Sequence, residues 1–138
     1  MKKLFFISAI ILVCITNGYS QTTTAKTDDL APKEKMLCKT WKMVSSEQFG
    51  VVAKPTEAEK NDSLTFTNDR KVTVTREGKT LQGSWKTNKI QSYIYISVDN
   101  STEKILFKLI SVNDKELVYE YQDPDLIRTT YTYQAANK

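Results

Sequence analysis

The chain has 138 residues, with 20 basic and 16 acidic side chains and no histidine. The length fits a single domain, and charges scattered without a block of one sign give no support for nucleic-acid binding. The absence of histidine excludes Ser-His-Asp and Cys-His catalysis and histidine-bearing zinc sites.

The first segment, residues 1–20, has the features of a secretory signal peptide. A positive start precedes an apolar, uncharged stretch over 4–15, and Gly18 and Ser20 are small residues before Gln21. Twelve such residues extend only about 18 Å as a helix, too short for a ~30 Å bilayer core. We therefore expect cleavage, export to the periplasm, outer envelope or exterior, and no integral membrane span in the mature chain.

The two cysteines bear on anchoring and on disulfides. A lipidated cysteine follows a small residue, whereas Val13 precedes Cys14, so we favour cleavage over a lipid anchor. Cleavage leaves Cys38 as the one cysteine, which rules out an internal disulfide. Cys38 either packs as a small hydrophobe, the interpretation we favour, or pairs between chains.

The next stretch, residues 21–31, is polar and unpatterned and is interpreted as a flexible tether. A helix of two turns follows, because Pro32 suits the first helical position and Glu34 places negative charge in the first turn. Met36 and Leu37 are expected to face the core.

From Trp41 onward the apolar residues recur with a period of two. Alternation with many β-branched and aromatic residues is typical of half-buried strands, and turn residues separate the segments. Eight strands are predicted, at 41–46, 63–67, 71–75, 80–86, 92–98, 104–112, 116–122 and 127–133.

Short connections favour antiparallel hairpins, and closure into a barrel removes the two exposed edges of such a meander. The sequence therefore predicts an all-β domain over 32–138: an eight-stranded antiparallel up-and-down β-barrel with the short helix capping one end. The connection over 47–62 is long, and a loop of that length is usually functional or disordered.

From Leu37 on, the chain resembles the lipocalin-like, or calycin, barrels, especially the small secreted ones of Gram-negative bacteria. The resemblance rests on a short helix leading into Trp41, the long loop after the first strand, and SLTFTNDRKVTV as a second hairpin. It also rests on the Gly-Ser-Trp motif that ends at Trp85 in a middle strand. The last feature is Arg128 on the final strand.

The resemblance implies structural roles for two residues. Trp41 would pack at the closed end of the barrel, and the guanidinium of Arg128 would lie across its indole as a cation–π contact. The sequence departs from the lipocalin pattern at Lys39, where glycine is usual, and in its shorter mature chain.

The sequence shows no group of carboxylates arranged for catalysis or metal binding. Asp123 and Asp125 flank a proline as turn residues do, and the segment 99–103 lacks the spacing and glycine of a calcium loop. No nucleotide-binding glycine motif is present. We therefore expect no enzyme activity, no cofactor and no metal site; carboxylate or tyrosine catalysis stays the least favoured alternative.

Aromatic residues carry the remaining functional hint. Six of the seven tyrosines lie between residues 93 and 133. They either fill the core or line a cavity whose hydroxyls orient a ligand. The candidate cavity residues are Trp85, Phe107, Tyr119 and Tyr131, with the 47–62 loop as a lid.

Two non-catalytic functions follow from these patterns. The favoured one is binding of a small apolar or amphipathic molecule inside the barrel. The alternative is a cell-envelope interaction or inhibitor module with a filled barrel, which binds a protein partner through its rim loops, chiefly Gln48 to Asp62. A monomer is expected.

Overall fold

The computed structural model describes residues 29–137, so the expected signal peptide and most of the expected tether lie outside the described residues. Within this range, no helix is long and apolar enough to cross a membrane. One helix precedes nine strands: α1 (Pro32–Leu37), β1 (Thr40–Gln48), β2 (Val51–Ala53), β3 (Ser63–Phe66), β4 (Lys71–Arg76), β5 (Lys79–Thr87), β6 (Tyr93–Val98), β7 (Lys104–Val112), β8 (Glu116–Gln122) and β9 (Arg128–Ala135).

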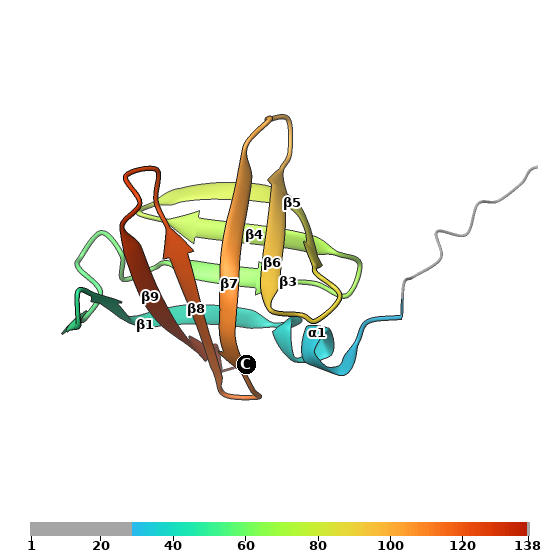
Figure 1. Cartoon of the computed structure of the whole chain (residues 1–138), viewed down its shortest axis with the longest axis horizontal. Helices are drawn as coiled ribbons and strands as arrows, with labels where there is room; N and C mark the ends of the chain where they lie inside the picture. The colour runs from blue at the N-terminus through green and yellow to red at the C-terminus, as the bar shows by residue number, and fades with distance from the viewer. Residues whose placement is uncertain (1–28, 138) are drawn as a thin grey trace, which may run out of the picture.

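The sheet closes on itself because β1 pairs with both β3 and β9. All neighbouring strands are antiparallel, and β3 to β9 follow one another in chain order around the wall (Figure 1). The predicted eight-stranded up-and-down barrel is confirmed, with β1 and β3–β9 as its eight strands. Figure 1 shows α1 beside one end of β1 and the β1–β2 hairpin at the other.

The ninth strand, β2, extends the far end of β1 as a short hairpin. Phe49 and Gly50 adopt φ values of 51° and 78°, as the central residues of a tight hairpin turn do. Ser46 to Gln48 then pair with β2, whose residues are all exposed. The expectation of a loop over 47–62 is therefore wrong in its first part, because Val51 and Val52 pair with the end of β1.

The helix α1 buries only one of the two residues expected to face the core. Leu37 is fully buried, whereas Met36 is 40% exposed, because successive helical residues point about 100° apart. Glu34 is buried instead. Leu30 also joins the core, so the expected tether does not extend as far as this residue.

The barrel interior is filled by the inward-facing residues of alternating strands. The largest fully buried side chains are Leu37, Trp41, Leu64, Phe66, Ile94, Ile96 and Leu117. Most of them lie in the half of the barrel next to α1, which is therefore solid.

Candidate ligand-binding cavity

A cavity of about 340 Å³ lies in the other half of the barrel, at the end formed by the β4–β5 and β6–β7 turns. Its volume falls in the lower part of the range for small-molecule sites. Apolar and aromatic side chains form its wall, and charged side chains of two strand ends form its rim. The wall consists of Leu64, Val74, Leu81, Ile105, Phe107, Tyr119, Tyr121 and Tyr133, and the rim includes Arg76, Glu77, Lys79 and Glu103.

Stacked aromatic rings from β7, β8 and β9 line one side of this cavity. The ring of Phe107 stacks on that of Tyr119 at 4.2 Å between centroids. The Tyr119 hydroxyl donates to the Tyr133 hydroxyl over 3.4 Å. Burial raises the pKa of Tyr119 well above its usual value and that of Tyr133 to about 12. Both hydroxyls are therefore neutral at physiological pH.

Arg76 is a charged residue that lies over two further tyrosine rings at this end of the barrel. It is the last residue of β4, in phase with the buried Val72 and Val74, and it is itself exposed at the end of the strand. Its guanidinium carbon lies 5.5 Å from the ring centroid of Tyr121 and 5.3 Å from that of Tyr131. Its Nη2 donates to the Tyr131 hydroxyl over 2.5 Å. The Arg76 side chain thus reaches across this open end of the barrel, from β4 to Tyr131 on β9.

A second, more open hollow of about 310 Å³ is lined in part by Tyr131. It is lined by residues of β1, β2 and β9 and by Glu59 of the following segment. The 47–62 connection, expected to be a lid, therefore borders this hollow and contributes no lining residue to the 340 Å³ cavity.

The four aromatic residues predicted as cavity candidates separate in space. Phe107 and Tyr119 line the cavity, and Tyr131 lines the second hollow. Trp85 lines neither, so its expected place at the cavity is wrong. Because β5 runs back toward the helix, its inward residue Trp85 ends in the solid half, edge-on to Phe66 at 5.4 Å.

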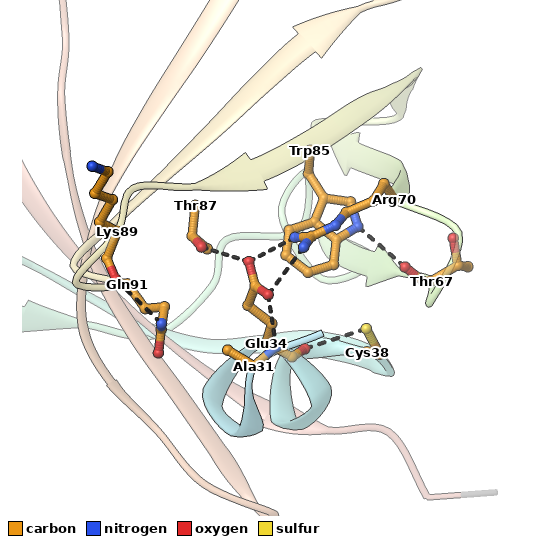
Figure 2. A network of polar contacts seen from close by, with 9 residues as sticks. All are labelled: Ala31, Glu34, Cys38, Thr67, Arg70, Trp85, Thr87, Lys89 and Gln91. Atoms are coloured by element: carbon orange, nitrogen blue, oxygen red, sulfur yellow. Dashed lines mark hydrogen bonds and ion pairs between the residues drawn. The ribbon is translucent and has the colours of Figure 1, made fainter. Parts of the chain in front are cut away.

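A polar network at the helix end holds Trp85 in place (Figure 2). The guanidinium carbon of Arg70 lies 4.8 Å from the Trp85 ring centroid. The Nη1 and Nη2 of Arg70 donate to the two carboxylate oxygens of Glu34 over 2.6 and 3.0 Å. The Thr87 hydroxyl and the Ala31 backbone N–H also donate to this carboxylate.

These contacts govern the ionisation of Glu34. Burial acts to raise its pKa, but the hydrogen bonds from Arg70, Thr87 and Ala31 outweigh burial and lower the pKa to about 2. The Glu34 carboxylate is therefore ionised, and both of its oxygens accept hydrogen bonds from within the protein. These contacts fix α1 to the barrel at this end.

The Trp41–Arg128 contact expected from the family resemblance is wrong. Trp41 is fully buried beside α1, and its Nε1 donates to the Leu37 carbonyl over 2.9 Å. Lys39, not Arg128, places its charge near the indole, at 5.2 Å. Arg128 is exposed and begins β9, whereas Trp41 pairs with Ala135 at its end. Seven residues of strand separate the two positions, about 23 Å at ~3.3 Å per residue.

Sequence reasoning gave Glu34 a role only in the first turn of the helix and did not single out Arg70 or Arg76. A signal for Arg76 was present, since it shares the phase of Val72 and Val74 in the segment KVTVTR. Glu34 and Arg70 lie 36 positions apart and carry no shared pattern. Among residues 29–137, no group of three or more His, Cys, Asp or Glu side chains is placed to hold a metal ion.

Comparison with protein-family models and with curated proteins found no match. Solved structures do match. A lipocalin-like protein from Bacteroides uniformis aligns with a TM-score of 0.57 at 14% identity, over 73% of this chain and 99% of its own. A DUF4847 family protein from Bacteroides vulgatus aligns with a TM-score of 0.52 at 13% identity, over 78% and 99%. The fold of this chain is therefore lipocalin-like.

Proposed function

We propose that this protein is an exported, non-catalytic barrel that binds a small amphipathic molecule in the cavity between β4, β5, β7 and β8. The observation that carries the proposal is the 340 Å³ cavity with an apolar and aromatic wall and a charged rim. A wall of this kind takes up apolar surface, and a few polar groups at the mouth orient the ligand.

Nothing around the cavity favours a reaction over simple binding. The Tyr119 and Tyr133 hydroxyls have pKa values raised by burial, which opposes their action as bases near neutral pH. Glu77 and Glu103 are exposed at the rim. The arrangement supports retention of a ligand by burial and orientation of its polar end.

A pair of neighbouring substitutions on β7 tests the cavity. Ile105 lines the cavity, whereas the adjacent Leu106 is 45% exposed on the outer face of the same strand. Ile105→Trp should fill the cavity and weaken binding of the neutral dye N-phenyl-naphthylamine by at least about tenfold. Leu106→Trp is the matched control and should leave the affinity unchanged. Equal dye binding by the two variants contradicts the proposal. So does a lack of dye binding by the wild type and both variants.

The natural ligand is sought by native extraction. Protein purified from its own cells without detergent is denatured in organic solvent, and the extract is examined by mass spectrometry. A compound recovered from the wild type at near-stoichiometric amount and absent from Ile105→Trp supports the proposal. Equal recovery from both proteins argues for binding outside the cavity.

The exported location rests on residues 1–20 and needs its own experiment. Cell fractionation followed by intact-mass measurement should find a mature chain that begins at Gln21 outside the cytoplasm. A lipid-sized mass increase on a chain that begins at Cys14 would show anchoring instead. A full-length chain in the cytosolic fraction would overturn export.

A second candidate function, a protein-interaction module, is favoured by one feature of the rim. Phe49, Val51 and Val52 in the β1–β2 hairpin are 84%, 69% and 66% exposed. An apolar tip of this kind is a frequent partner contact. Replacing all three by serine should abolish recovery of a specific partner from envelope extracts, whereas Leu126→Ser, at another exposed turn, should not. Equal recovery by both proteins removes this candidate.

A further inference from the structure

Four neighbouring strands of the barrel wall, β4 to β7, contain basic residues and no acidic residue. These strands lie side by side, because each pairs with the next (Figure 1). Their basic residues are Lys71, Arg76, Lys79, Lys86, Lys104 and Lys108. In a chain whose basic and acidic side chains number 20 and 16, this part of the wall therefore carries a local positive charge.

Exposed apolar side chains alternate with lysines on the outer face of this wall. On β7, Leu106 is 45% exposed and Ile110 50%, although the side chains of the inward positions between them are buried. Tyr95 on β6 is 40% exposed, and it pairs with Leu106 on one side and with Lys86 on the other. Six exposed residues thus form an outer stripe, which consists of Lys86, Tyr95, Lys104, Leu106, Lys108 and Ile110.

The lysines of the outer stripe have few carboxylate partners. Within residues 29–137, Lys86 and Lys104 form no ion pair, and Lys108 lies 3.8 Å from Glu120 of β8. The exposed Arg128 lines a hollow of about 150 Å³ with Lys108 and Glu120, so cations outnumber carboxylates there as well. The turns that join β3 to β7 hold four carboxylates at the strand ends: Asp69, Glu77, Asp99 and Glu103.

We propose that the outer stripe docks this protein onto the surface of an anionic lipid bilayer. Tyr95, Leu106 and Ile110 enter the headgroup region, and the lysine stems lie beside them with their ammonium groups at the lipid phosphates. A flat bilayer meets the convex wall of a barrel along one strip. The outer stripe has this shape, since its β7 residues extend over about 20 Å at ~3.3 Å per residue.

The alternation of lysine and apolar side chains favours a bilayer over a macromolecular partner. Lysine is depleted at the centre of protein–protein interfaces, whereas each apolar residue of the outer stripe has a lysine beside it. A single-stranded nucleic acid stacks its bases on successive aromatic rings, and Tyr95 is the one aromatic residue of the outer stripe. A bilayer uses both side-chain types at once.

Cosedimentation with lipid vesicles tests the proposal. At low salt, the wild type should bind vesicles of equal parts phosphatidylcholine and phosphatidylglycerol at least about tenfold more tightly than vesicles of phosphatidylcholine alone, because each lysine at an anionic surface contributes about fivefold. The difference should shrink as salt is added. Equal binding to both kinds of vesicle, or binding to neither, overturns the proposal and leaves the proposed cavity function standing.

Two triple variants of equal charge locate the contact. The first combines Lys86→Gln, Lys104→Gln and Lys108→Gln, and it should bind the anionic vesicles at least about tenfold more weakly than the wild type. The control combines Lys42→Gln, Lys54→Gln and Lys60→Gln. Its residues lie on β1 or after β2, and Lys60 has one carboxylate partner, as Lys108 does. The control should keep most of the affinity; equal losses would show that net charge alone acts and would overturn the proposal.

Substitutions of Leu106 separate insertion from charge attraction alone. Leu106→Trp places an indole on the outer stripe, and its fluorescence emission should shift to shorter wavelength on the anionic vesicles, whereas Leu106→Ser should weaken binding. The native Trp41 and Trp85 are buried and give a constant background. Unshifted emission from bound protein overturns insertion. Binding to soluble dextran sulfate as tight as to vesicles, with no effect of Leu106→Ser on either, would identify a soluble anionic polymer as the partner and overturn the proposal.

All proteins are purified in the form that the cell accumulates, so that any contribution of residues before Asp29 is common to the wild type and the variants. Circular dichroism establishes that each variant is folded. The comparison of anionic with neutral vesicles for the wild type decides the question if a variant does not fold.

Discussion

Arg70 is held between the indole face of Trp85 and the carboxylate of Glu34, and this sandwich joins α1 to the β3–β4 turn and to β5 (Figure 2). The charge pair is largely removed from water, since the Glu34 side chain is 7% exposed and that of Arg70 28%. Hydrogen bonds satisfy the whole carboxylate. The helix is therefore fixed to the barrel by polar contacts as well as by Leu37.

Removing the charge of Glu34 should destabilise the protein in a pH-dependent way. The folded-state pKa is about 2, below the reference value of 4.5, so its contribution is present above pH 4.5 and is lost as the pH falls toward 2. At pH 7 we expect Glu34→Gln to cost about 3 kcal/mol in urea unfolding, with a much smaller difference near pH 2. Glu57→Gln, at an exposed pair with Lys60, is the control. A difference that is constant with pH contradicts this assignment.

Truncation of Trp41 tests its burial beside α1. Trp41→Ala removes a fully buried side chain and its hydrogen bond to the Leu37 carbonyl. The free energy of unfolding should fall by about 3–5 kcal/mol. Leu126→Ala, at a residue 74% exposed, should change it by no more than about 0.5 kcal/mol. Circular dichroism during urea titration measures both, and near-wild-type stability of Trp41→Ala would show that the site is not packed.

Comparison of two arginine variants separates the observed cation–π contact from the one expected from the family resemblance. Arg70→Ala leaves the buried Glu34 carboxylate without its partner and should cost about 3–5 kcal/mol. Arg128→Ala removes an exposed side chain and should cost about 0.5 kcal/mol or less. Thermal melting of both proteins checks the ranking. A larger loss for Arg128→Ala would restore the expected role of Arg128.

A close approach of two strands makes Gly83 sensitive to any side chain. A Cβ at this position would overlap the backbone carbonyl of Ser97 on β6. Gly83→Ala should therefore force β5 and β6 apart and cost about 1–3 kcal/mol. Ser84→Ala, at the exposed neighbouring position, should be nearly neutral in the same melting experiment. Equal melting temperatures for the two variants would show that the strands adjust freely.

The thiol of Cys38 should react slowly in the folded protein. Burial raises its pKa, and its Sγ lies 3.3 Å from the Glu34 carbonyl, to which it donates. Modification by a disulfide reagent at pH 8 should be at least about tenfold slower than in urea-unfolded protein, because the thiolate is the reacting species. Rapid modification, or a disulfide-linked dimer on non-reducing gels, would support pairing between chains instead.

Local patterns in the sequence predict most of the wall of the barrel. Each strand carries its own alternation, and short turns fix its neighbour, so the order of β3 to β9 follows from the sequence. The hairpin formed by β1 and β2 was missed because three residues are too few to show a period. Phe49 adopts a positive φ in the turn, and phenylalanine is not a residue type that predicts a turn.

The functional ends are less predictable because they depend on residues far apart in the chain. Phe107 and Tyr119 were predicted at the cavity from their phase, and the structure places them there. The same phase argument failed for Trp85, since alternation gives the face of a strand and not the depth along it. Glu34, Arg70 and Arg76 meet their partners across large distances in the sequence, and only the closed barrel brings these residues together.

Closure of this barrel depends on a short seam. The ladder between β1 and β3 has three residue pairs, whereas that between β1 and β9 has seven. Two flanking backbone hydrogen bonds, Met43 to Asp62 and Phe66 to Lys39, lengthen the seam slightly. If the seam opens, the wall becomes a curled sheet with two free edges, and free edges recruit strands from other molecules. Resistance of this protein to aggregation is thus concentrated in these few contacts at the start of β1.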